Sequence, residues 1–182
     1  MGWIVLLLIF GLVLVCASMY NRLLKARNAF KSAFVLFDVQ LTRRYDLIPN
    51  LVEVADGYIR HERETLDALL QALNIAYAGL RSAAFDPANA AAVRQLAGAE
   101  QQLGNALARL QGMVAAYPEL KVNQQMLQLT EELSSSEQKV AGARQAYNDS
   151  VLSYNQACEL FPTSLVAGMC NFHPAQLLKV EE

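Results

Sequence analysis

Trp3–Met19 reads WIVLLLIFGLVLVCASM and contains no charged side chain. A helix over this stretch is about 26 Å long at about 1.5 Å per residue, close to the roughly 30 Å hydrocarbon core of a bilayer. Trp3 and Tyr20 bracket the stretch, where the membrane interface favours aromatic rings, and Phe10 lies between them. We therefore predict a transmembrane anchor over residues 1–20, with the lipid bilayer as its partner.

A cleaved signal peptide is the competing interpretation of this stretch. Such a peptide needs a basic segment before the apolar run and a cleavage site with small residues after it. Only Met1 and Gly2 precede the run, and neither is basic. Residues 16–18, CAS, loosely resemble a cleavage site or a lipoprotein box. The helical pattern nevertheless continues into YNRLLKARNAFKSAF without a turn residue, which favours an uncleaved anchor.

The charges beside the anchor predict its orientation. The basic residues Arg22, Lys25, Arg27 and Lys31 follow it, and none precedes it. Lys and Arg stay on the cytoplasmic side of a membrane. We expect a single-pass protein of the inner (cell) membrane, with a short N-terminus outside and the bulk of the chain in the cytoplasm. A periplasmic location remains the alternative.

After the anchor, apolar residues recur at steps of three and four throughout, and no stretch alternates like a strand. The sequence predicts an all-α fold in which the transmembrane helix continues into a long antiparallel, up-down four-helix bundle. Pro49, the pair Asp86-Pro87, Pro118 and Pro162 are the expected breaks. The expected parts are helices at about 21–47, 49–80, 87–117 and 120–161, which form a bundle over 21–161, and a C-terminal tail at 162–182 that packs on the bundle or on the membrane surface.

The segment DVQLTRRYDLIPN, residues 38–50, places an Asp, the pair Arg43-Arg44, a second Asp and a Pro-Asn break in a short span of an otherwise amphipathic pattern. We interpret it as a polar clamp at the corner between the first two helices, where exposed ion pairs contribute only about 0.2–0.5 kcal/mol each. The alternative is a phosphate or acidic-peptide site at the paired arginines. The clamp residues are Asp38, Arg43, Arg44, Asp46 and Asn50.

Two Tyr-Asn pairs, Tyr147-Asn148 and Tyr154-Asn155, lie seven residues apart and so share a helix face. Tyrosine hydroxyls and asparagine amides inside a bundle need partners, so we expect core tyrosines and asparagines that bond to a neighbouring helix. An aromatic groove for an extended peptide is the alternative.

No motif indicates catalysis, a cofactor or a metal. His61-Glu62 is not an HExxH motif because Thr65 stands at the second histidine position, and there is no P-loop, GxSxG or GxGxxG. Cys158 and Cys170 do not form a metal-like CxxC pair. The net charge of −2 implies no bulk attraction to nucleic acid. We expect a protein that is not an enzyme and binds no cofactor, no metal and no nucleic acid.

Val35 and Leu36 lie away from the expected inward face of the first helix. Two exposed apolar residues near an anchor suggest contact with lipid or with a second copy of the chain. They are our candidate self-association residues for a possible homo-oligomer. The uncharged part of the tail either caps the open end of the bundle or reaches back to the bilayer surface, and we expect the cap.

Nearly the whole chain resembles the LemA family. The likeness rests on the order of the anchor and six segments: YNRLLKARNAF, DVQLTRRYDLIPNLVE, GYIRHERETL, AYPELKVNQQMLQLTEEL, KVAGARQAYNDSVLSYN and FPTSLVAGM. The resemblance implies a membrane-anchored bundle of long helices without an established enzymatic activity. The chain departs from the family pattern at two positions: Leu36 stands where a polar residue is usual, and Ala146 stands where an aromatic residue is common.

These observations together favour a non-enzymatic scaffold or adaptor at the inner membrane, which self-assembles or holds an unknown protein partner. A signalling or ligand-sensing module that binds a peptide or a lipid headgroup is the alternative.

Overall fold

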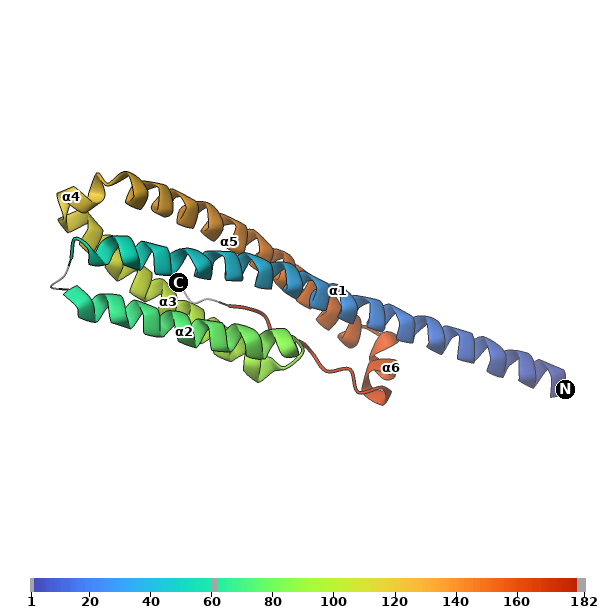
Figure 1. The fold of residues 1–182 in the computed structure, drawn as a ribbon. Helices are drawn as coiled ribbons and strands as arrows, with labels where there is room; N and C mark the ends of the chain where they lie inside the picture. The colour runs from blue at the N-terminus through green and yellow to red at the C-terminus, as the bar shows by residue number, and fades with distance from the viewer. Residues whose placement is uncertain (1, 60–61, 180–182) are drawn as a thin grey trace.

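The computed structural model describes residues 2–59 and 62–179, and in these ranges it contains helices and no strand. The predicted all-α fold is confirmed (Figure 1). Met1 of the predicted anchor, His61, and residues 180–182 of the predicted tail lie outside the described ranges. The helices are α1 (Gly2–Asp56), α2 (Arg63–Phe85), α3 (Ala90–Ala116), α4 (Pro118–Lys121), α5 (Gln124–Glu159) and α6 (Thr163–Met169).

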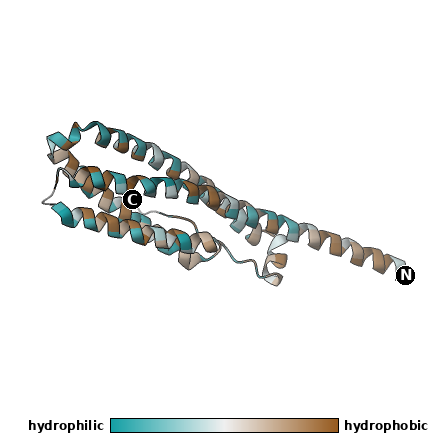
Figure 2. Cartoon of the chain, viewed as in Figure 1, coloured by the Kyte–Doolittle hydropathy of each residue, from teal (hydrophilic) through white to brown (hydrophobic). Residues whose placement is uncertain are grey.

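The first helix is one unbroken rod that begins in the apolar stretch and ends deep in the bundle. Its first part projects alone from the other helices and is apolar on every side (Figures 1 and 2). From Trp3 to Val15 every large apolar side chain is exposed, by 49–85%. Within the described ranges, α1 is the one helix long and apolar enough to cross a membrane. The predicted continuity between anchor and bundle is therefore confirmed.

The predicted break at Pro49 is wrong, because Pro49 lies inside α1. A proline inside a helix removes one backbone hydrogen bond and costs about 3 kcal/mol or more. The residues around it outweigh this cost, since Ile48, Leu51 and Ala55 continue the buried stripe of α1. The first helix therefore ends at Asp56 and not at the predicted residue 47. The second begins at Arg63 and not at the predicted residue 49.

Four long helices, α1, α2, α3 and α5, run in alternating directions beyond the projecting end of α1 (Figure 1). The closest packing is of α5 along α1 and of α2 along α3, while α1 also contacts α2. Gly79 permits the close approach of α2 and α3, because a Cβ there would lie 3.3 Å from the Leu96 Cα. The short α4 forms the corner that leads into α5.

The α1–α5 contact contains the largest aromatic cluster. The Phe34 ring meets the Tyr147 ring edge-on at a centroid distance of 5.4 Å, and Phe30 lies 5.0 Å from the ring of Tyr154. All four side chains are buried. The buried stripe of α5 runs from Met126 to Cys158, with Ala143 half-buried in it, whereas Val122 and Phe161 on either side of the helix are exposed.

The chain turns sharply at both ends of α6. A cis bond joins Phe161 to Pro162 just before this helix. After the helix, Asn171 adopts a positive φ of 60°, and the amide of Phe172 donates to the carbonyl of Ala167 at 3.0 Å. This is a Schellman-type ending, in which asparagine takes the left-handed position. It directs residues 172–179 back along α5 (Figure 1).

Candidate functional site

Arg44 is a buried arginine that bonds across the bundle. Its Nη2 donates to Oε2 of Glu100, on α3, at 2.5 Å, and both residues are 9% exposed. The hydroxyl of Tyr45 donates to the other carboxylate oxygen of Glu100. Burying a carboxylate is costly unless it is paired and hydrogen-bonded, and here both oxygens are satisfied. Two consecutive residues of α1 thus hold a single residue of α3.

The next residue along α1 extends this cluster to α2. The Tyr77 hydroxyl donates to Oδ1 of Asp46 at 2.7 Å, and the rings of Tyr45 and Tyr77 meet edge-on at 4.8 Å. Burial and the bond to Asp46 raise the pKa of Tyr77 to about 12, so its hydroxyl remains a donor at neutral pH. We call Arg44, Tyr45, Asp46, Tyr77 and Glu100 the polar cluster; it joins α1, α2 and α3.

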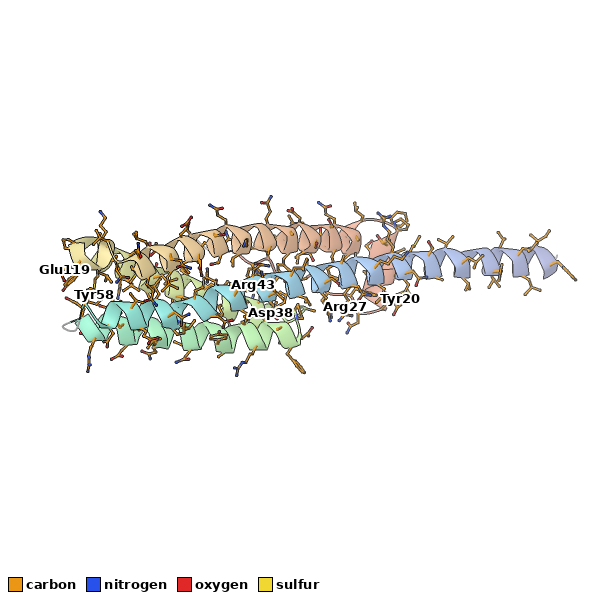
Figure 3. The ribbon with its side chains drawn as sticks, turned by 45° about the horizontal axis from the view of Figure 1, so that its top comes forward. Tyr20, Arg27, Asp38, Arg43, Tyr58 and Glu119 are labelled. Carbon is orange, nitrogen blue, oxygen red and sulfur yellow. The ribbon has the colours of Figure 1, made fainter. Side chains whose placement is uncertain are left out.

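The structure corrects the position of the predicted clamp. Its residues lie in the middle of α1, as Figure 3 shows for Asp38 and Arg43, and not at a helix corner, because the helix continues to Asp56. Arg43 and Asn50 are exposed and outside the polar cluster. Asp38 is half-buried, and this burial raises the pKa of its carboxyl group.

Sequence reasoning missed Glu100 and Tyr77, the partners of the clamp on other helices. Glu100 did carry a signal. It lies four residues after Leu96 and three before Leu103, so it interrupts the apolar stripe of α3 with a charge. A charged residue on a buried stripe needs a buried partner of opposite charge. The sequence does not say which of the arginines provides it.

A hollow of about 400 Å³ lies beside the polar cluster. The three helices α1, α3 and α5 enclose it, and Leu178 of the tail reaches one side. Its lining has charges of both signs, from Arg44, Glu100, Glu137 and Arg144. The Nε atom of Arg44 is buried without a hydrogen-bond partner in the described part of the chain. Within the same part, no three His, Cys, Asp or Glu side chains gather as a metal ion would require.

The two Tyr-Asn pairs bind the tail of the chain itself. Asn155 donates from Nδ2 to the Ala175 carbonyl at 3.0 Å and accepts from the Ala175 amide at 2.8 Å. Asn148 repeats both bonds with Leu178, at 3.1 and 2.9 Å. Each asparagine thus pairs with both backbone groups of one tail residue. The sequence predicted hydrogen bonds to a neighbouring helix, but the partner is extended chain.

The tyrosines add one bond to each pair. Tyr147 donates to the Gln176 carbonyl and Tyr154 to the His173 carbonyl, both at 3.0 Å. Burial raises the pKa of both tyrosines, which keeps their hydroxyls protonated as donors. The tail residue that each hydroxyl binds therefore lies two positions before the tail residue that the neighbouring asparagine binds. We call Tyr147, Asn148, Tyr154 and Asn155 the tail ladder.

The register of the tail ladder follows from helix and strand geometry. A step of seven residues along α5 rises about 10.5 Å, and the step of three residues from Ala175 to Leu178 spans about 9–10 Å when the tail is extended. The buried tail side chains, Phe172, Ala175 and Leu178, recur every third residue. This is the period of a polyproline-II chain. The hydrogen bonds from the tail ladder to the tail all go to backbone atoms, so they recognise the extended conformation, and the buried tail side chains add packing at every third residue.

The two adjacent arginines of α1 provide a matched pair for testing the polar cluster. Arg44→Ala leaves Glu100 buried without its cation, and we expect a loss of about 3–5 kcal/mol of unfolding free energy. Arg43→Ala removes an exposed side chain, and the expected change is within about 0.5 kcal/mol. Chemical denaturation of the detergent-solubilised chain measures both. Equal effects of the two substitutions would contradict the buried pairing.

One comparison with known proteins identifies the family of the chain. No curated protein matches the chain in a sequence search. The model of the LemA family matches residues 33–182, which include the bundle, the polar cluster and the tail ladder. The apolar start of α1 precedes this match and fits a membrane-anchored helical protein. Because the match covers most of the chain, the protein belongs to the LemA family.

Proposed function

We propose that this protein is a non-enzymatic, single-pass scaffold or adaptor that holds a helical bundle at the cell membrane. The observation that carries the proposal is the continuity of α1 from Gly2 to Asp56. A helix without a hinge transmits the position of the anchor to the bundle. The α5 and α2 helices both pack on α1, so the whole bundle is held at a fixed place relative to the bilayer.

The lipid-headgroup alternative at the paired arginines is not favoured. Arg43 lies twenty-three residues beyond Tyr20, about 35 Å further along a straight α-helix. Arg44 is already paired with Glu100 inside the bundle. A second pocket, at Arg43, is lined by the carboxylates of Asp46, Glu131 and Glu132 as well as by Lys139, so its net charge is negative and repels an anionic headgroup. These observations favour the scaffold over a lipid-headgroup site at the two arginines.

The proposed orientation, with the bundle in the cytoplasm, is tested with single cysteines. In a background with Cys16→Ser and Cys170→Ser, Ala108→Cys places a thiol on the exposed face of α3, and Gly2→Cys places one before the anchor. In intact cells we expect a membrane-impermeant maleimide to label only the Gly2→Cys variant. Permeabilised cells should show labelling of both. The opposite pattern in intact cells would place the bundle outside.

Self-assembly is the scaffolding mode that we propose. The side chains of Val35 and Leu36 on α1 are 58% and 63% exposed, and Val39 beside them is 43% exposed. Together they form a small apolar face on the helix that fixes the bundle to the membrane. Copies anchored in one bilayer bring these faces to the same height, which favours their association in pairs.

Leu36→Glu is expected to lower the particle mass of the detergent-solubilised protein by putting a charge on this face. Leu127→Glu, at a 54% exposed position on α5, is the control and should leave the mass unchanged. The measurement is light scattering coupled to size-exclusion chromatography. If the particle mass of the unsubstituted protein already corresponds to one copy of the chain, the self-assembly proposal is wrong.

A peptide-binding module is the second candidate function, because the tail ladder can hold extended backbone of other sequences. A partner segment would need the tail's pattern, with an aromatic, a small and an aliphatic residue at every third position. The tail itself competes for the ladder at an effective concentration of order mM. We therefore propose that such a partner binds only when the tail is displaced.

A labelled peptide of residues 171–179, NFHPAQLLK, tests this candidate. Leu178→Asp puts a charge at a 2% exposed position and should release the tail. We expect the peptide to bind this variant at least tenfold more tightly than the same variant with Asn148→Ala and Asn155→Ala added. Fluorescence anisotropy measures the affinity, and far-UV circular dichroism checks that both variants are folded. Equal binding to the two variants, or none, would exclude the peptide-binding candidate.

A further inference from the structure

The corner between α5 and α6 exposes large apolar side chains that the bundle does not use. Phe161 is 81% exposed and Met169 is 87% exposed. Leu160 and Leu165, in the same corner, are 59% and 62% exposed. From Leu160 to Phe172 the chain has no charged residue. A cluster of this kind on a protein surface marks a contact with lipid or with another protein.

The inner face of the same corner fixes its position. Thr163, Val166 and Ala167 of α6 are buried, and α6 lies against α1. Just after α6, the Phe172 ring meets the Tyr20 ring edge-on at a centroid distance of 5.7 Å. Tyr20 directly follows the uncharged stretch of α1. Figure 3 labels Tyr20 at the point where α6 meets α1 and the free part of α1 begins.

We propose that the α5–α6 corner, residues 160–169, inserts its exposed apolar side chains into the membrane interface beside the anchor. This inference rests on the proposed function, in which α1 crosses the membrane. The corner lies at the height of Tyr20, where an interfacial aromatic is expected. Its occupant is therefore a lipid surface. In Figure 2, α6 with its apolar residues lies beside α1 at the point where the free, apolar part of α1 begins.

The neighbouring charges agree with this placement. Arg22 and Lys25 are exposed on α1 just beyond Tyr20, at the level of the phospholipid headgroups. Exposed Glu159 directly precedes the corner and sets the depth to which it can enter, because a carboxylate stays in water. The corner therefore lies in the interface like a short amphipathic segment, while residues 172–178 remain on the bundle.

Phe85 shows why exposure alone does not define this contact. It is 93% exposed at the end of α2, more than Phe161 or Met169 of the corner. The next residue, Asp86, forms an ion pair with Lys31 at 3.5 Å. Lys31 lies eleven residues beyond Tyr20, about 16 Å further from the membrane along α1. Phe85 therefore remains in water and serves as the matched control.

Tryptophan fluorescence in liposomes with brominated acyl chains tests the proposal. The chain has one tryptophan, Trp3, so Trp3→Phe provides a silent background for single-tryptophan variants. In this background, Phe161→Trp and Met169→Trp report on the corner, and Phe85→Trp is the control. We expect the brominated lipids to quench at least one of the two corner variants more than twofold, with blue-shifted emission. The control should show unquenched emission of water-exposed tryptophan.

Two outcomes would overturn the inference. Quenching of neither corner variant beyond the control would place the corner in water. Blue-shifted emission without quenching would mean that a second copy, and not lipid, covers the corner. The unsubstituted protein separates this failure from failure of the anchor. If Trp3 is quenched, the anchor is in the bilayer whatever the corner does, and if Trp3 is not quenched, both proposals fail together.

Discussion

The rest of the structure depends on one constraint, which is that a single α-helix serves two environments without a break. Between Trp3 and Val15 the surface of α1 is apolar all round, as a lipid environment requires. Beyond Leu23 only one stripe is buried, and the partner helices cover it. The helix passes from the fully apolar surface to the single buried stripe without a turn, because only the side chains differ between the two parts and the backbone stays helical. In the proposed membrane-anchored protein, this continuity sets the height of the bundle above the bilayer.

Polar contacts then give the bundle its register. Apolar burial alone discriminates weakly between alternative axial positions of two packed helices, because the hydrophobic effect is not directional. The bonds of Arg44 and Tyr45 to Glu100 have a fixed geometry, so they select one axial position of α3 against α1. The tail ladder does the same for the tail on α5. Specific placement, more than added stability, is what these buried polar groups contribute.

Two later segments of the chain, α6 and the start of the tail, pack at the end of the bundle from which the apolar part of α1 projects. After α5 returns to the level of Tyr20, α6 packs on α1, and the tail runs back along α5. The anchor is thereby connected to the first and the last helix of the bundle. A rigid connection at this end suits a protein whose proposed role is to hold copies or partners at the bilayer.

The sequence by itself determined the long apolar start of the first helix, the helical class and most of the buried stripes, because helix periodicity and apolar length are local properties. It did not determine the end of α1, since buried neighbours outweigh the local effect of Pro49. Nor did it assign the partners of Arg44 or of Asn148, which lie 56 and 30 residues away. Only the tertiary structure decided these, because a hydrogen bond between distant segments depends on where the whole fold brings them.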